Sequence, residues 1–216
     1  NCLNHVSERH PCPKYYGSSP ARQFSSLLSL SLAPMLACTV TIKNSTTSPL
    51  LQPEPDDSHF MEQALQQAAL APHAGEVPIG AVLVHNHEVI AAGHNYREIS
   101  QDPTAHAEMV VIRKAAEQLR TWRLTETTLY VTLEPCPMCA GAIVQSRIAR
   151  LVFGAWDPKA GACGSIFDIP AERRLNHRVQ VVGGLLEQES RELLQMFFRA
   201  KRGALSESSS SPKPPS

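Results

Sequence analysis

From about residue 58 onward, the spacing of hydrophobic positions predicts a series of helices and strands. A helix is expected over 58–70, with Ser58 as its N-cap, because Pro72 and Gly75 interrupt the pattern just beyond it. The apolar run 79–85 and the segment 88–92 predict two strands of a β-hairpin, joined by a two-residue turn between them.

The rest of the body changes repeatedly between helical and strand-like spacing. In chain order it predicts a helix over 105–119, a strand over 129–133, a helix after Pro137, a strand over 151–154, a weaker strand over 178–182 and an amphipathic helix over 187–202. A strand–helix–strand unit needs a crossover connection, so at least one strand pair must be parallel. We therefore predict one α/β domain over 58–203, with a mixed central sheet flanked by helices.

Both ends of the chain differ from this body in composition. Residues 9–53 contain no Asp or Glu and many serines, and the apolar run 27–40 is interrupted by serines and by Pro34. A signal or lipoprotein segment and a transit peptide are two interpretations. Because the run is too short to span a bilayer, we expect 1–57 to be a disordered or non-native extension instead. The Ser- and Pro-rich residues 204–216 are expected to form a disordered tail.

Charge and cysteine content narrow the possible functions only slightly. Lys+Arg and Asp+Glu number 20 each, so no global field indicates a nucleic-acid partner, although a local basic patch is compatible with this balance. The cysteines are not spaced like the disulfide framework of a small secreted protein. Three of them fall in the body, and the close Cys136-x-x-Cys139 pair favours metal binding.

Two short segments carry the candidate chemistry, and each begins a predicted helix. One contains His106 and the other contains Cys136 and Cys139. The positive end of a helix dipole stabilises thiolate, and one imidazole with two thiolates suits zinc. Three protein ligands leave the fourth position open, as a catalytic zinc requires for a bound water.

Glu108 lies two residues beyond His106, within reach of such a site but outside the ligand set. A carboxylate there can take a proton from water and return it to the substrate. The H-x-E and P-C-x-x-C pair is the known signature of zinc deaminases that act on nucleobases. The alternative is a closed structural zinc with Cys163 or a nearby histidine as fourth ligand. The glutamate and the separate helix for the histidine argue against it.

Beyond the zinc motif, several segments resemble the bacterial tRNA-specific adenosine deaminases of the cytidine-deaminase superfamily. These segments are 76–82, 93–95, 102–108, 129–142, 146–148, 152–155 and 176–179, and the resemblance extends over 59–203. The zinc motif is shared with cytidine, deoxycytidylate and guanine deaminases, so the flanking segments carry the narrower resemblance. It implies a cytidine-deaminase-like three-layer fold.

The resemblance also implies a reaction and its partners. It points to hydrolytic deamination of adenosine to inosine at the wobble position of a tRNA anticodon, expected to be an arginine tRNA. Zinc-activated hydroxide would attack adenine C6, with Glu108 as the proton shuttle. A homodimer with one zinc per subunit would bind the anticodon stem-loop without membrane association. The expected location is the cytoplasm, or an organelle if the N-terminal stretch is a transit segment.

Residue by residue, the resemblance assigns further substrate contacts. Asn95 would hydrogen-bond the flipped base, although a turn asparagine after a strand is the structural alternative. Pro135 and the Glu134 carbonyl would shape the base pocket. Arg97, Asp157, Lys159, Phe198 and Arg202 match positions that contact RNA in the family. For Phe198 a place in the core, together with Leu193, Leu194 and Phe197, is the alternative, and the basic end of the last helix is equally compatible with a solvated cap.

Two other functions fit part of this pattern. A free-base or nucleotide deaminase of the guanine or cytosine type would use the same metal chemistry without an RNA surface. A non-catalytic RNA-binding subunit would keep the zinc ligands and replace the glutamate, and the presence of Glu108 argues against it.

Overall fold

Five strands form one mixed sheet in the order β2-β1-β3-β4-β5. Their bounds are β1 Gly80–His85, β2 Glu88–His94, β3 Thr127–Leu133, β4 Arg150–Ala155 and β5 Gln180–Gly183. Strand β1 is antiparallel to β2 and β3, whereas β3–β4 and β4–β5 are parallel. The mixed sheet and its parallel crossover confirm the prediction. The β1–β2 turn lies at Asn86 and His87, both with positive φ, as a tight hairpin requires.

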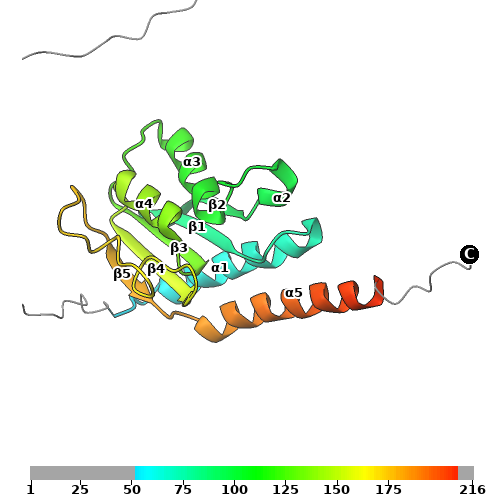
Figure 1. Cartoon of the computed structure of the whole chain (residues 1–216). Helices are drawn as coiled ribbons and strands as arrows, with labels where there is room; N and C mark the ends of the chain where they lie inside the picture. The colour runs from blue at the N-terminus through cyan, green and yellow to red at the C-terminus, as the bar shows by residue number, and fades with distance from the viewer. Residues whose placement is uncertain (1–51, 209–216) are drawn as a thin grey trace, which may run out of the picture. The chain divides into compact units, whose positions relative to one another are not determined.

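Helices cover both faces of this sheet (Figure 1). Their bounds are α1 Asp57–Leu70, the 3₁₀ helix η1 Ala71–Ala74, α2 Arg97–Ser100, α3 Ala107–Leu119, α4 Pro137–Gln145 and α5 Glu187–Ser208. Helices α3 and α4 lie on one face, and α1 and α5 lie on the other. This arrangement confirms the three-layer α/β fold.

Residues 52–208 are described in this computed structural model, with side chains through 203. All of them fall in one unit, Ser45–Ser216. Residues 1–51, on which the signal, transit and extension interpretations depend, lie outside the described residues, as do residues 209–216 of the expected tail. Within residues 52–208, no helix has both the length and the apolar character needed to cross a bilayer.

The hydrophobic core is divided between the two faces of the sheet. Leu83 and Phe153 pack toward α3 and α4, whereas Val82 and Val152 pack with Phe60 of α1. Successive residues of a strand point to opposite faces, so strands that are apolar throughout fill both layers. This is why the central strands read as continuous hydrophobic runs rather than as alternating ones.

A buried ion pair joins α1 to the sheet. The guanidinium of Arg150 donates to both carboxylate oxygens of Asp57 at 2.6 Å, and the Tyr130 hydroxyl donates to the same carboxylate at 2.8 Å. The carboxylate also accepts the backbone N–H of Glu54 at 2.7 Å. The predicted N-cap at Ser58 is therefore wrong. These contacts bring Asp57 into the helix, and Asp56 occupies the N-cap position.

The last helix differs from the prediction in length and in the side chains it buries. It continues to Ser208 instead of ending near Arg202, so the expected tail begins with helical backbone. No proline occurs between residues 187 and 211 to interrupt the helical hydrogen bonds. Phe198 is 42% exposed, so the alternative that placed it in the core is wrong. Leu193, Leu194 and Phe197 are half-buried.

Candidate metal centre and active site

One end of the sheet collects the segments that build the site. The register pairs Gly80 with His94 and Leu133 with Ala155, so the start of β1 and the ends of β2, β3 and β4 lie together. Helix α3 follows β2 and helix α4 follows β3, so both begin near this end. The two motifs found in the sequence are therefore brought together by topology, although about 30 residues separate them.

His106 and Cys136 occupy the N-cap positions of α3 and α4, each with an extended backbone, and Cys139 is buried in the first turn of α4. The Nδ1 atom of His106 lies 3.7 Å from Sγ of Cys136 and 3.6 Å from Sγ of Cys139. All three ligand atoms lie within 4.8 Å of one another. A tetrahedral zinc with bonds of about 2.0–2.3 Å places N and S donors roughly 3.6 Å apart. The donor set and its spacing fit zinc.

The two thiols interact as a pair. A hydrogen bond from Cys139, supported by the imidazole of His106, lowers the pKa of Cys136 to about 3 against the effect of burial. The same hydrogen bond and burial raise the pKa of Cys139. The hydrogen bond with Cys136 also raises the pKa of His106, although burial opposes it. Two thiolates this close repel each other, and a bound dication would compensate their negative charge.

Glu108 lies in the first turn of α3 and is only 4% exposed. Burial raises the pKa of its carboxyl group, while the charge of His106 acts in the opposite direction. A carboxyl group with a raised pKa holds a proton more readily than an exposed one and can return it to a neighbouring group. Beside three metal-ligand atoms, it is placed to act as an acid and base.

Asn95 connects the end of β2 to the start of α3. The side-chain oxygen of Asn95 accepts the backbone N–H of Ala107 at 2.9 Å, and the backbone N–H of Asn95 donates to the Ile79 carbonyl at 3.0 Å. The residue is 3% exposed. The first N–H of α3 is thus satisfied by Asn95, immediately after the ligand His106.

Glu134 and Pro135 lie at the turn between β3 and Cys136, and both are buried. The Glu134 carboxylate accepts the backbone N–H groups of Asp157, Cys163 and Ser165, each at 3.0 Å, and the Ser165 hydroxyl. The Pro135 carbonyl accepts the N–H of Ala162 at 2.8 Å. Both residues therefore bind the loop 156–165, hereafter the β4 loop, to the metal-ligand turn.

Two of the predicted RNA contacts are on this β4 loop. The Asp157 carboxylate accepts the N–H of Lys159 at 2.9 Å and forms a turn that leaves the Lys159 side chain exposed. Arg97 is exposed at the start of α2, and its positive charge tends to lower the pKa of His106. Arg97 follows the end of β2, at the end of the sheet where His106 lies.

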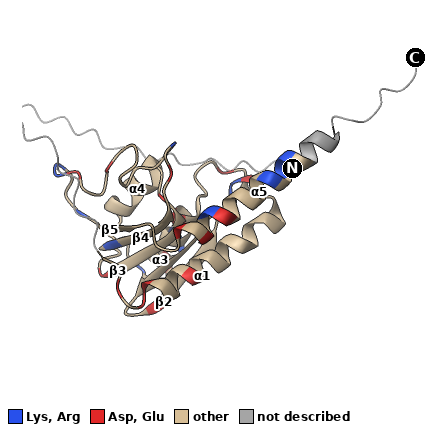
Figure 2. Ribbon diagram, turned by 90° about the horizontal axis from the view of Figure 1, so that it is seen from below, with Lys and Arg blue, Asp and Glu red and all other residues tan. Residues whose placement is uncertain are grey.

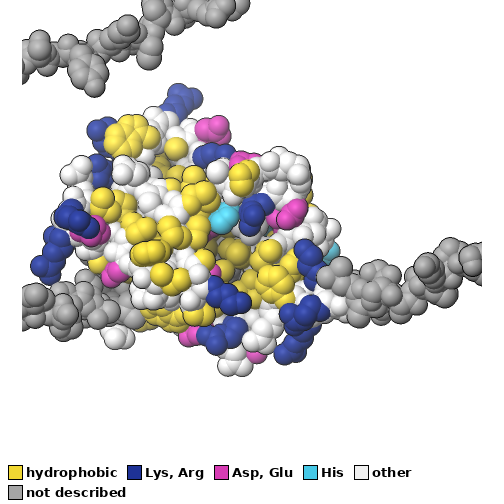
Figure 3. All heavy atoms as spheres, in the orientation of Figure 1, with side chains coloured by type: hydrophobic (Ala, Val, Ile, Leu, Met, Phe, Trp, Pro, Cys, Tyr) yellow, Lys and Arg dark blue, Asp and Glu magenta, His cyan; other side chains and the backbone are white. Residues whose placement is uncertain are grey.

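Phe198 and Arg202 are exposed on α5, across the sheet from α3 and α4 (Figure 1). Lys and Arg residues are concentrated in the C-terminal half of α5 (Figure 2). On the face shown in Figure 3, a histidine lies among hydrophobic side chains, with Lys and Arg side chains beside it. The structure brings His106, Glu108, Cys136 and Cys139 together, with Asn95 bonded to the residue between the first two. It leaves Phe198 and Arg202 on a separate helix.

Sequence reasoning assigned no role to Glu76, which is 1% exposed. Its carboxylate accepts the N–H groups of Glu98 and Ile99 at 2.7 and 3.0 Å, so it caps α2 from 22 residues away. The only signal was its position at the start of a family-like segment. Cys163, the alternative fourth ligand, is also buried, and its thiol faces the Pro135 carbonyl at 4.0 Å. It is not part of the three-ligand group.

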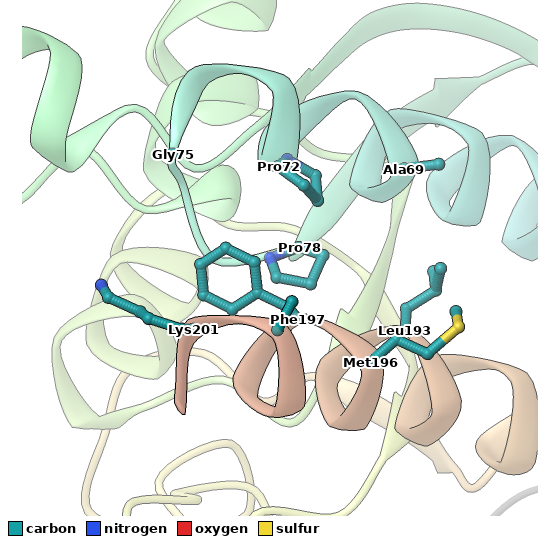
Figure 4. A pocket seen from close by; sticks show the side chains of 9 residues that line it. Ala69, Pro72, Gly75, Pro78, Leu193, Met196, Phe197 and Lys201 are labelled. Atoms are coloured by element: carbon teal, nitrogen blue, oxygen red, sulfur yellow. The ribbon is translucent and has the colours of Figure 1, made fainter. Parts of the chain in front are cut away.

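An apolar groove of about 530 Å³ lies between the α1–η1 corner and α5 (Figure 4). Phe197 and Pro78 form part of its wall, and Lys201 lies at one end with Nζ 5.8 Å from the Phe197 ring. None of its lining residues belongs to the metal-ligand group. The groove explains why the apolar side of α5 is only half-buried.

The chain is similar in sequence to known deaminases. The family model of MafB19-like deaminases matches residues 55–202. A tRNA-specific adenosine deaminase of Bacillus subtilis is 54% identical over 146 residues, which cover 68% of this chain and 91% of that protein.

Two solved structures extend the comparison. One comes from studies of A-to-I editing by tRNA:A34 deaminases at the wobble position. It is 50% identical, covers 63% of this chain and 99% of the other, and has a TM-score of 0.62. A guanine deaminase from Nitrosomonas europaea is 26% identical, with coverage of 70% and 88% and a TM-score of 0.55. The adenosine deaminases therefore share about twice as many residues with this chain as that guanine deaminase does.

Proposed function

The chain belongs to the MafB19-like deaminase family and to the tRNA-specific adenosine deaminases, and from this premise we propose that it converts adenosine to inosine at the wobble position of a tRNA anticodon. The observation that carries the proposal is the convergence of His106, Cys136 and Cys139 at two helix N-termini beside the buried Glu108. An arginine tRNA is the expected substrate.

His106, Cys136 and Cys139 would hold one zinc ion per subunit. When bound, zinc acts as a Lewis acid that lowers the pKa of water toward neutrality. The three residues would leave a fourth coordination position for that water, because no other His, Cys, Asp or Glu side chain among the described residues joins their group. The protein ligands thus supply charge and geometry.

Glu108 performs the proton transfers in this proposal. Hydrolysis forms a bond between C6 of adenine and the water oxygen, breaks the bond between C6 and the exocyclic nitrogen, and releases ammonia. The attacking water must lose a proton and the leaving nitrogen must gain one. A single buried carboxylate next to the ligands can carry that proton from one to the other, which avoids separated charges in a desolvated site.

The residues around the ligands would recognise the base and its RNA. The side-chain oxygen of Asn95 is already bonded to Ala107, so its NH₂ group is the part available to a flipped base. Pro135 and the Glu134 carbonyl would border the base. Arg97, Asp157 and Lys159 would contact the RNA near the site, and Phe198 and Arg202 would contact it from α5, offsetting the stacking that the flipped base loses.

The test is incubation of the purified chain with an arginine-tRNA anticodon stem-loop carrying adenosine at the wobble position. A matched stem-loop with that adenosine moved one position along the loop serves as control. Inosine should appear at the wobble position only. Sedimentation of the same sample tests the expected homodimer.

A free-base deaminase is the second candidate, because the guanine deaminase from Nitrosomonas europaea shares this fold at 26% identity. Parallel incubations with free guanine, cytidine and adenosine separate the two functions. If the chain deaminates one of these small molecules and forms no inosine in the RNA, the free-base function replaces the tRNA assignment.

A further inference from the structure

Two buried glutamates near the metal ligands have an unusual type of partner. Most carboxylates inside proteins pair with a cationic side chain, as Asp57 does with Arg150 in this chain. Glu76 and Glu134 are 1% and 2% exposed, and each accepts hydrogen bonds from backbone N–H groups of a surface segment. Proton transfer at Glu108 uses neither of them.

Glu134 holds the β4 loop by several points at once. Its first oxygen accepts the N–H groups of Cys163 and Ser165, and its second accepts the N–H of Asp157 and the Ser165 hydroxyl. The packing is so close that a Cβ added at Gly161 would lie 2.1 Å from the carboxylate. The loop therefore has one preferred position relative to the turn that precedes Cys136.

Glu76 does the same for α2 with one oxygen, which accepts the N–H groups of Glu98 and Ile99. Helix α2 has only four residues, too few to be stable alone. Its exposed residues include Arg97, which is proposed to contact the RNA. The buried carboxylate therefore fixes the segment that carries Arg97.

The two glutamates reach these segments from the same end of the sheet. Glu76 precedes β1 and Glu134 follows β3, and these strands are antiparallel neighbours whose register pairs Ala81 with Val131. Helix α2 follows the edge strand β2, and the β4 loop follows β4. Helices α3 and α4, which carry the candidate metal ligands at their N-termini, begin at this same end of the sheet.

We propose that Glu76 and Glu134 are positioning residues that hold α2 and the β4 loop in place as two preformed rims of the RNA-binding surface. The inference rests on the proposed function, because it names the part of the tRNA site that these carboxylates organise. A rim that is ordered before binding loses less conformational entropy when the RNA binds. Hydrogen bonds from backbone N–H groups to a charged carboxylate are stronger than those to a neutral acceptor, so they suit this purpose.

The experiment compares Glu76→Gln and Glu134→Gln with the wild-type chain. An amide keeps the shape of the side chain, but it loses the negative charge and turns an NH₂ group toward backbone donors. Ser165→Ala removes one donor to Glu134 and is a milder second variant that should fold in any case. Tyr130→Phe removes a buried hydrogen bond to Asp57 on the opposite face of the sheet and is the matched control.

Deamination of the wobble stem-loop is measured as kcat and KM, together with zinc content. Each Glu→Gln variant should raise KM about tenfold, or ~1.4 kcal/mol, with kcat within about threefold and zinc unchanged. A variant that binds the substrate and the transition state more weakly by the same amount has a raised KM and an unchanged kcat. Ser165→Ala should raise KM less, and Tyr130→Phe should leave KM unchanged. An unchanged KM in both Glu→Gln variants, or a loss of kcat that follows loss of zinc, overturns the inference.

Amide hydrogen exchange separates this inference from the proposed function. Exchange at Asp157, Cys163 and Ser165 should accelerate in Glu134→Gln only, and exchange at Glu98 and Ile99 in Glu76→Gln only. If the wild-type chain makes no inosine, the proposed function fails while these exchange results still show whether the rims are braced. Unchanged exchange with intact wild-type activity would refute the bracing alone.

Discussion

The side-chain oxygen of Asn95 accepts the backbone N–H of Ala107 at 2.9 Å, which joins the end of β2 to the first turn of α3. Ala107 lies between His106 and Glu108, so one amide group fixes the backbone of both a metal ligand and the proposed proton carrier. The bond is buried, and its loss would leave an N–H group without a partner away from water.

Asn95→Ala should lower the free energy of unfolding by about 1–3 kcal/mol, the cost of a buried donor without an acceptor. Asn95→Asp keeps the acceptor, so its stability should stay closer to wild type, whereas both variants lose the NH₂ group proposed to contact the base and should deaminate more slowly. Urea unfolding and inosine formation are the measurements. Equal stability of the alanine and wild-type chains would contradict the role of the hydrogen bond.

Glu108→Ala should preserve the fold and the zinc content but reduce deamination by about 10²–10⁴-fold, the usual contribution of a general acid–base. The residue lies outside the ligand set, which is why metal binding should survive. Single-turnover assays with metal analysis check this. Substantial activity in the variant would exclude Glu108 as the proton carrier.

Cys136→Ser should lose most bound zinc, because a hydroxyl does not replace a thiolate whose pKa is lowered to about 3. Cys163→Ser is the matched control, since that thiol faces the Pro135 carbonyl and should be dispensable for the metal. Zinc per chain, measured after dialysis, distinguishes them. Loss of zinc in Cys163→Ser would support the closed four-ligand site.

The Asp57–Arg150 pair should make stability depend on acid pH. Burial alone would raise the pKa of Asp57, but hydrogen bonds from Arg150, Glu54 and Tyr130 outweigh it and the net pKa is below 3.8. A depressed folded-state pKa contributes stability that is present above the unfolded value and lost as pH falls through the folded value. The contribution should therefore be complete at neutral pH and decline below about pH 4.

Asp57→Asn tests this dependence. At neutral pH it should cost about 3–5 kcal/mol, because it leaves the Arg150 charge buried without a partner. The difference from wild type should begin to narrow as pH falls below about 4, where Asp57 of the unfolded chain becomes protonated before the paired Asp57 of the folded protein does. Denaturant titrations from pH 7 to pH 3 measure it. A difference that stays constant over this range would contradict the assigned pKa shift.

Two glycines provide a contrast in packing. A Cβ at Gly80 would lie 2.2 Å from the Ala64 carbonyl oxygen and 2.3 Å from the Ala68 nitrogen, both in the α1 backbone. Gly80→Ala should therefore destabilise the fold by about 3 kcal/mol or more. Gly141 lies in α4 with no atom near its added Cβ, and Gly141→Ala should add about 0.5–1 kcal/mol. Thermal unfolding compares the two.

The sequence by itself determined the sheet strands, the principal helices and the three candidate metal ligands that the structure brings together. Hydrophobic periodicity is a local property, and the His106-x-Glu108 and Cys136-x-x-Cys139 spacings each lie within one helical turn. The parallel crossover followed from the length of the strand–helix–strand unit. These features could be predicted because neighbouring residues are sufficient to specify them.

Only the tertiary structure decided which distant polar groups meet. Asp57 and Arg150 are 93 residues apart, Glu76 caps a four-residue helix 22 residues away, and Glu134 binds a loop 23–31 residues ahead. The exposure of Phe198 likewise depends on how α5 packs against α1 and the sheet. A buried carboxylate has no periodicity to reveal it, since its partner is set by the register and crossing of strands rather than by its neighbours in the chain.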